Sequence, residues 1–180
     1  MTECIALLRG INVGRAKRIA MSDLRQMLVD LGHGNVRTLL NSGNVLFRCA
    51  RPNTAKLALA IQKAVKDNCG FTAQVTVMTA ATLAAIVNEN PLLPVAKDPS
   101  RHLVAFATQP RSLAPLRPMS AESWAPDALA FGSRAAYLWC TAGVLDSKLS
   151  QAFARSAGDT VTTRNWATVL KLLDAANRPA

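Results

Sequence analysis

The 180-residue sequence predicts an α/β protein of the α+β type, made of two subdomains in which helices pack on one face of an antiparallel sheet. Half of the residues are hydrophobic and only 18% are charged, a balance typical of packed globular proteins and not of disordered basic ones. Short apolar runs alternate with segments of helical spacing, which indicates sheet and helix together. A stretch with three prolines, residues 90–100, separates two halves whose elements follow a similar order.

The first half begins with an apolar run, Glu3–Arg9, which has the character of a buried strand. A basic loop with two glycines, residues 10–20, follows it. A helix then begins, with Ser22 as its expected N-cap and apolar side chains at helical spacing up to Leu31. The next elements are expected to be strands at 36–40 and 45–49 joined by an Asn-Ser-Gly-Asn turn, a helix ending near Gly70, and a strand at 73–78. This βαββαβ order is that of the ferredoxin-like fold.

The second half is expected to be a looser version of the same fold. A third helix capped by Thr79 precedes the proline-rich connector. The following elements are expected to be a strand at 102–108, a weak helix at 112–119 broken by two prolines, strands near 129–131 and 136–140, and helices starting near Ser147 and Thr163. We therefore predict a ferredoxin-like subdomain plus a helix at 1–90, a connector at 91–100, and a second ferredoxin-like subdomain with C-terminal helices at 101–180.

The composition excludes several classes of protein. The longest charge-free stretch, residues 68–88, contains glycine, glutamine and threonines and does not have the character of a membrane span. The first residues lack the cationic start and long apolar centre of a secretory signal. Four scattered cysteines without a C-x-x-C pair favour reduced thiols, and two isolated histidines give no metal-ligand pattern. We expect a cytoplasmic protein without a cofactor or a bound metal.

The excess positive charge is spread over both ends of the chain, and four basic residues lie near the first loop. The net charge is +10, and Arg9, Arg15, Lys17 and Arg18 flank the glycines of Gly10-Ile-Asn-Val-Gly14. The glycine spacing matches neither GxxxxGK[ST] nor GxGxxG, so neither named phosphate motif is present. A glycine-shaped loop before a helix start favours anions, but the same segment also fits an ordinary turn, which is the more common case.

Two predicted helix starts in the second half carry a cation directly after a hydroxyl. These are Ser147-Lys148 and Thr163-Arg164. A cation at a helix N-terminus costs about 0.3 to 1 kcal/mol, and a bound anion would reverse that effect. The alternative is that both side chains extend into solvent, where the interaction is screened. The spacing alone favours neither interpretation.

Catalytic motifs are scarce. The sequence has no GxSxG, no histidine beside a Ser or Asp arrangement, and no paired carboxylates in one motif, so whether it is an enzyme is left open. With 5% aromatic residues, it also offers few side chains on which bases could stack. Ser147 or Lys148 as a nucleophile would need a neighbouring base or a lowered lysine pKa.

Several blocks together resemble one known family. They are ALLRGINVG at 6–14, MSDLR at 21–25, VRTLLNSGNVLF at 36–47, and SKL with TTRNWATVLKLL towards the C-terminus. In this order they are similar to the domain-of-unknown-function family sixteen ninety-seven, which implies two ferredoxin-like subdomains and no assigned activity. Asp146 differs from the basic or small residue usual in the family and would weaken an anion site at Lys148.

The resemblance also implies that loop and hairpin residues of these blocks share a role. We expect them to bind a small anionic ligand, with phosphate as one candidate group, at a site between the subdomains. The predicted ligand-binding residues are Arg9, Asn12, Ser42, Asn44, Ser147, Lys148, Thr163, Arg164 and Asn165. The alternative is a nucleic-acid-associated module that binds through its basic surface, without a membrane partner; the oligomeric state is not predicted.

Overall fold

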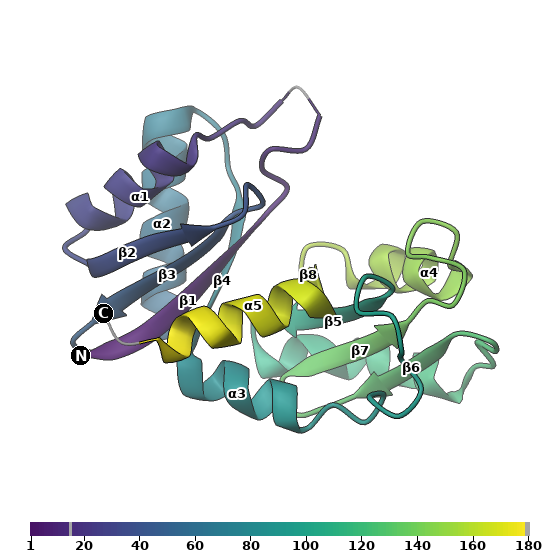
Figure 1. The fold of residues 1–180 in the computed structure, drawn as a ribbon. Coiled ribbons are helices and arrows are strands. Elements are labelled where there is room, and N and C mark those ends of the chain that lie inside the picture. The colour runs from purple at the N-terminus through teal and green to yellow at the C-terminus, as the bar shows by residue number, and fades with distance from the viewer. Residues whose placement is uncertain (15, 179–180) are drawn as a thin grey trace. The chain divides into compact units, whose positions relative to one another are not determined.

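A computed structural model describes residues 1–14 and 16–178 of the chain, which forms two compact units. Unit 1 contains Met1–Leu83 and Leu172–Ala180, and unit 2 contains Ala84–Lys171. The elements of unit 1 are β1 (Thr2–Arg9), α1 (Met21–Asp30), β2 (Gly34–Leu39), β3 (Asn44–Cys49), α2 (Thr54–Cys69) and β4 (Gln74–Thr79), shown in Figure 1. Two helices, α3 (Ala80–Asn88) and α5 (Trp166–Asn177), contribute residues to both units.

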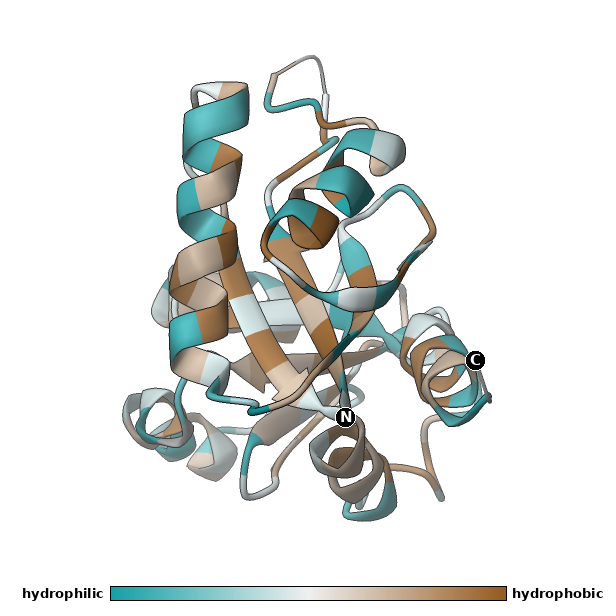
Figure 2. Ribbon diagram, turned by 90° about the vertical axis from the view of Figure 1, so that its left-hand side faces the viewer, coloured by the Kyte–Doolittle hydropathy of each residue, from teal (hydrophilic) through white to brown (hydrophobic). Residues whose placement is uncertain are grey.

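Unit 1 is a four-stranded antiparallel sheet with the strand order β2-β3-β1-β4. This order, with the sequence βαββαβ, is the ferredoxin-like arrangement expected from the apolar runs. The face that carries Cys4, Ala6 and Leu8 of β1 packs against buried side chains of α1 and α2. Figure 2 shows the apolar sides of these helices turned towards the sheet and their polar sides turned outwards.

Different local features determine where α2 ends and where α1 begins. Gly70 ends α2 with φ 74°, a left-handed conformation that glycine adopts without steric cost. Helix α1 begins two residues earlier than a Ser22 N-cap requires, because Ala20 occupies the N-cap position and Ser22 lies in the first turn. The expected Ser22 cap is therefore wrong. Instead, the Ser22 hydroxyl donates to Asp23 Oδ1 at 3.1 Å.

Unit 2 repeats the topology with different helices. Its strands are ordered β6-β7-β5-β8, and they are β5 (His102–Ala107), β6 (Ala128–Phe131), β7 (Ala135–Trp139) and β8 (Val161–Asn165). On one face of this sheet, Leu103 and Ala105 pack with buried residues of η1 (Pro110–Ala121) and α4 (Lys148–Ala157). On the other face, His102 stacks on Trp166, and the Tyr137 hydroxyl donates to the backbone carbonyl of Ile86 at 2.6 Å.

Two elements of unit 2 differ from the sequence expectation. The weak helix is a 3₁₀-helix, η1, since Pro115 and Pro118 lie inside it and cannot donate the N–H that an α-helix needs. The expected helix start at Thr163 is wrong, because Thr163 lies in strand β8, opposite Ala105 of β5. Helix α5 starts at Trp166, where Asn165 Oδ1 accepts from the Thr168 N–H at 2.9 Å.

Other expected caps are confirmed. Thr79 Oγ1 accepts from the Thr82 N–H at 3.1 Å at the start of α3. Ser147 is the N-cap of α4. In the described part of the chain, no helix combines the length and apolarity needed to cross a membrane.

Candidate functional site

The loop between β1 and α1, residues 10–20, is folded back on itself by Asn12. The Asn12 Oδ1 atom accepts from the Ile19 N–H at 2.9 Å, and Nδ2 donates to the Ile19 carbonyl at 3.0 Å. The same Nδ2 donates to the Asn41 carbonyl at 3.0 Å. Asn12 has φ 56°, a left-handed conformation that asparagine tolerates better than most residues. One side chain thus joins this loop to the β2–β3 turn.

The β2–β3 turn is held equally closely. Gly43, with φ 75°, accepts a backbone hydrogen bond from the Leu8 N–H at 2.8 Å. Asn44 is fully buried, and its Nδ2 donates to the Leu39 carbonyl and to Ser42 Oγ, both at 2.9 Å. A Cβ at Gly43 would lie 2.8 Å from Leu8 Cβ, so only glycine fits this close approach. The turn is fixed relative to β1.

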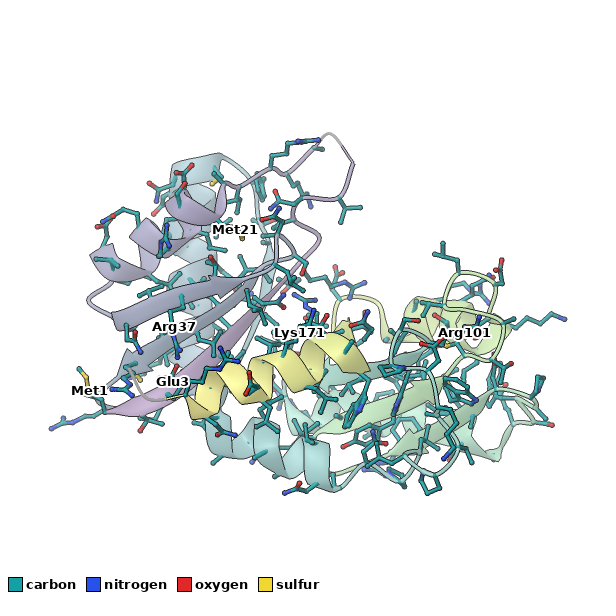
Figure 3. The ribbon with its side chains drawn as sticks, in the orientation of Figure 1. Met1, Glu3, Met21, Arg37, Arg101 and Lys171 are labelled. Atoms are coloured by element: carbon teal, nitrogen blue, oxygen red, sulfur yellow. The ribbon has the colours of Figure 1, made fainter. Side chains whose placement is uncertain are left out.

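Between this loop and this turn, unit 1 has a cavity of about 500 Å³ at the start of α1, which we call the α1 cavity. Its lining residues are Asn12, Arg18, Ile19, Ala20, Met21 and Asn41. Figure 3 marks Met21, the first residue of the helix, beside the loop. No side chain of the described residues caps α1. The N–H groups of a first helical turn have no intrahelical acceptor, and the helix dipole is positive there.

Arg18 is the cation of the α1 cavity. Its side chain is exposed, and Nη2 donates to the Gly14 carbonyl at 3.1 Å, which bends the arginine over its own loop. Its remaining N–H donors match the oxygens of a phosphate or a carboxylate. No acidic residue is among the described residues that line the α1 cavity. This combination favours an anion.

The four predicted site residues of unit 1 have different roles around this cavity. Asn12 lines it, and Ser42 and Asn44 hold the adjoining turn. Arg9 ends β1, in register with Gln74 of β4. Arg15, one of the four cations expected near the loop, lies outside the described residues. Only Asn12 of the four therefore borders the α1 cavity, and both of its amide hydrogens are already donated within the protein.

In unit 2, the buried Ser147 belongs to a partly buried hydrogen-bond network. Its hydroxyl donates to Asp127 Oδ2 at 2.7 Å and accepts from the Ser150 N–H at 2.9 Å. Asp127 Oδ1 also accepts from the backbone N–H and the hydroxyl of Thr141, both at 2.8 Å. Burial alone would raise the pKa of Asp127, but the hydrogen bonds from Ser147 and Thr141 hold it below its ordinary value.

This network also sets the chemistry open to Ser147. The carboxylate that contacts it is held ionised by three donors, so it is a poor acceptor of a further proton. Neighbouring Lys148 is exposed at the first position of α4, whereas the hydrogen bonds of the network join Asp127, Thr141, Ser147 and Ser150. The nucleophile hypothesis for Ser147 therefore has no support from this geometry.

The β8 residues of the predicted site stand in different environments. Thr163 is exposed, and Asn165 caps α5. Arg164 is partly buried, in register with Val104, and its Nη1 donates to the Thr163 carbonyl at 2.8 Å. Burial lowers the pKa of Arg164 to about 10, so the side chain remains a cation at neutral pH. A cation that is desolvated in this way favours an acceptor oxygen.

The predicted site residues thus divide between the two units, and their convergence on one site stays a prediction. Sequence reasoning named Arg18 only as one of four loop cations and did not single out Asn41 or Asp127. The available signal was weak: Arg18 lies two residues before the helical N-cap, but the expected cap at Ser22 placed it too far from the helix start.

The comparisons with known proteins agree on the fold. A family model described as a protein of unknown function, DUF1697, matches residues 1–137. The solved structure of the conserved bacterial protein SP0830 from Streptococcus pneumoniae is similar, with a TM-score of 0.82 and 21% sequence identity. The alignment covers 98% of this chain and 99% of that one. No match was found among proteins of curated function.

Proposed function

Since the chain belongs to the DUF1697 family, whose function is unknown, we propose a function from the geometry of unit 1: it binds a small anionic ligand in the α1 cavity. The observation that carries this proposal is the joint lining of one cavity by the Arg18 guanidinium and by the start of a helix without a side-chain cap. Both features favour negative charge.

The size and walls of the α1 cavity suggest the class of ligand. About 500 Å³ is within the range of about 300–1,000 Å³ that small-molecule sites occupy, and it exceeds what one inorganic phosphate needs. Ile19, Ala20 and Met21 supply apolar wall, whereas Arg18 and Asn41 supply polar groups. A phosphate ester with an organic part matches this division better than a free inorganic anion.

The test is isothermal titration calorimetry of the full chain, which gives its dissociation constants for inorganic phosphate, a sugar phosphate and a nucleoside monophosphate. We expect one of the two esters to bind more tightly than inorganic phosphate. Arg18→Ala should weaken that binding by about tenfold or more, since a charge-assisted hydrogen bond contributes about 1.5–3 kcal/mol. Arg18→Lys should retain part of it, because a lysine keeps the charge but not the planar fork.

The matched control is Arg155→Ala, which removes an exposed arginine from the last turn of α4 that is not among the residues lining the α1 cavity. Both variants lose one positive charge, so a general electrostatic effect would weaken binding equally in the two. Equal affinities of wild type and Arg18→Ala for every ester, or no binding of any anion, would contradict the proposal.

A second candidate, favoured by the net charge of +10, is binding of nucleic acid through its phosphate backbone. Lys17 and Arg18 are exposed on the β1–α1 loop and would take part. An oligonucleotide affinity that falls steeply and linearly on a log–log plot against salt would support this function. A salt-resistant affinity for a small ester would support the α1 cavity instead.

A further inference from the structure

We propose that Cys4 and Cys49 form a site of oxidative modification, at which an intramolecular disulfide joins β1 to β3. The two Sγ atoms lie 3.8 Å apart in the core of unit 1. All four cysteines of the chain are free thiols in the structure, and this pair comes from adjacent strands. The inference is independent of the α1 cavity and of the function proposed for it.

The strand register explains why these two sulfurs meet. Cys4 is opposite Phe47, and Cys49 is opposite Thr2, so the cysteines are diagonal neighbours on two hydrogen-bonded strands. Diagonal positions on one face of an antiparallel pair are near neighbours, and here the two sulfur atoms lie in contact at 3.8 Å. Both side chains point to the face covered by α1 and α2, where they belong to the same buried cluster. The contact is therefore a consequence of the sheet and not of a flexible loop.

The geometry also leaves little distance to close. A disulfide has an S–S length of about 2.05 Å, so the two sulfurs must approach by about 1.8 Å from their present separation of 3.8 Å. Cys49 is the last residue of β3, and its partner Thr2 is the first residue of β1. The ladder ends at this pair, so rotation about the Cα–Cβ bonds and a small shift of the strand end can bring the sulfurs together.

The two thiols differ in solvent accessibility, and this difference determines which of them is oxidised first. Cys4 has no exposed surface, whereas Cys49 keeps 7% of its surface exposed. Burial raises the pKa of the Cys4 thiol, and an oxidant cannot reach Cys4 from solvent, so Cys4 reacts as the second sulfur and not as the first. Cys49 is the sulfur that meets the oxidant.

The oxidant in this proposal is a peroxide. The Cys49 sulfur attacks one peroxide oxygen, an S–O bond forms, the O–O bond breaks, and water leaves after proton transfer when the peroxide is hydrogen peroxide. The Cys4 sulfur then attacks the Cys49 sulfur, the S–S bond forms, the S–O bond breaks, and a second water carries away the Cys4 proton. Two thiols and one hydrogen peroxide become one disulfide and two waters.

The test is peptide mapping of the full wild-type chain by mass spectrometry, without reduction, after treatment with hydrogen peroxide. We expect a peptide pair that joins Cys4 to Cys49, a mass loss of two hydrogens, and a fall from four titratable thiols to two in the unfolded protein. Dithiothreitol should restore all four. The oxidised chain should also unfold at a higher temperature, because the bond closes a loop between residues 45 positions apart.

The matched variants are Cys49→Ala and Cys69→Ala. Cys69 ends α2 and is the more exposed cysteine of unit 1, so its removal should leave the Cys4–Cys49 linkage unchanged. The Cys49→Ala variant should form no internal disulfide. Oxygen addition to Cys49 without a linkage, a linkage through Cys69, or four unreacted thiols would each overturn the proposal, and all three are read from the wild-type chain without relying on a variant.

Discussion

Asn12 donates both hydrogens of its side-chain amide to backbone carbonyls, at Ile19 and at Asn41. A ligand contact through these hydrogens would break bonds that shape the β1–α1 loop. Asn12 is therefore a positioning residue for the α1 cavity. Asn44 is also a positioning residue, because it is buried and its side-chain amide donates to Leu39 and Ser42 of the β2–β3 turn.

His102 should make the protein less stable in mild acid. It has no exposed surface, and burial lowers its pKa from 6.5 to about 4. The unfolded chain therefore binds a proton more tightly than the folded one, so the contribution of neutral His102 is complete above pH 6.5 and is lost as the pH falls towards 4. The loss over this window is about 3 kcal/mol in the free energy of unfolding.

Urea unfolding at a series of pH values, on wild type and on His102→Gln, measures this effect. Glutamine does not titrate, so the difference in the free energy of unfolding between the two proteins should change between pH 6.5 and 4. The contribution of His33 cancels in this difference because both proteins contain it. A difference that stays constant with pH would show that His102 does not titrate in this way.

Gly43 should be intolerant of alanine. A Cβ there would lie 2.8 Å from Leu8 Cβ and 2.9 Å from Ile11 Cδ1, and the residue has φ 75°. We expect Gly43→Ala to lower the free energy of unfolding by about 2–4 kcal/mol through strain and overpacking. Gly70→Ala is the matched control, because Gly70 has φ 74° and nothing within 4 Å of its Cβ position. It should cost only about 1–2 kcal/mol. Equal losses in chemical denaturation would contradict the close approach at Gly43.

Among the elements, α4 allows a structural role to be separated from a ligand role. Ser147→Ala removes the N-cap bond to Ser150 and the donor to Asp127, so we expect a loss of about 1–2 kcal/mol. Lys148→Ala removes an exposed side chain and should change stability by less than about 0.5 kcal/mol. Thermal unfolding of both variants tests this, and a neutral Ser147→Ala would show that the cap does not stabilise α4.

Elements with a clear local period were predictable from the sequence, and elements defined by their partners were not. The spacing of Leu24, Met27 and Leu28 was sufficient for α1, and Gly70 for the end of α2. Strand β8, with the sequence VTTRN, lacks an apolar run, and its identity depends on pairing with β5. Thr163 resembled a helix cap because threonine suits both roles, so the helix start was placed three residues too early.

The candidate site was less predictable for the same reason. The sequence indicated a basic glycine loop before a helix, but the α1 cavity depends on Asn41, which reaches it from another turn. The Cys4–Cys49 contact was equally unpredictable from the sequence, since the two sulfurs meet only in one register of β1 and β3. Register and turn pairing are long-range properties, and local periodicity contains little of this information.

For the molecule as a whole, α5 should be a sensitive element. Leu172 has no exposed surface, whereas Leu170, on the same helix, is 42% exposed. We expect Leu172→Ala to lower the free energy of unfolding by about 2–4 kcal/mol, because it leaves a cavity. Leu170→Ala should cost less than about 1 kcal/mol. Denaturant unfolding of the two variants compares the same substitution at a buried and at an exposed position. Equal losses in the free energy of unfolding would contradict the burial of Leu172.

The assignment of Leu172–Ala180 to unit 1 has a consequence for protein synthesis. Arg37 of β2 donates to the carbonyl of Ala175 at 3.1 Å and pairs with Glu3, a contact visible in Figure 3. A ribosome makes β1 to β4 first, then all of unit 2, and only afterwards Leu172 and Ala175. On a nascent chain that has not reached Ala175, Arg37 therefore has its partner Glu3 but lacks its backbone acceptor on α5. The first sheet to be translated therefore gains this hydrogen bond only after the ribosome has synthesised unit 2.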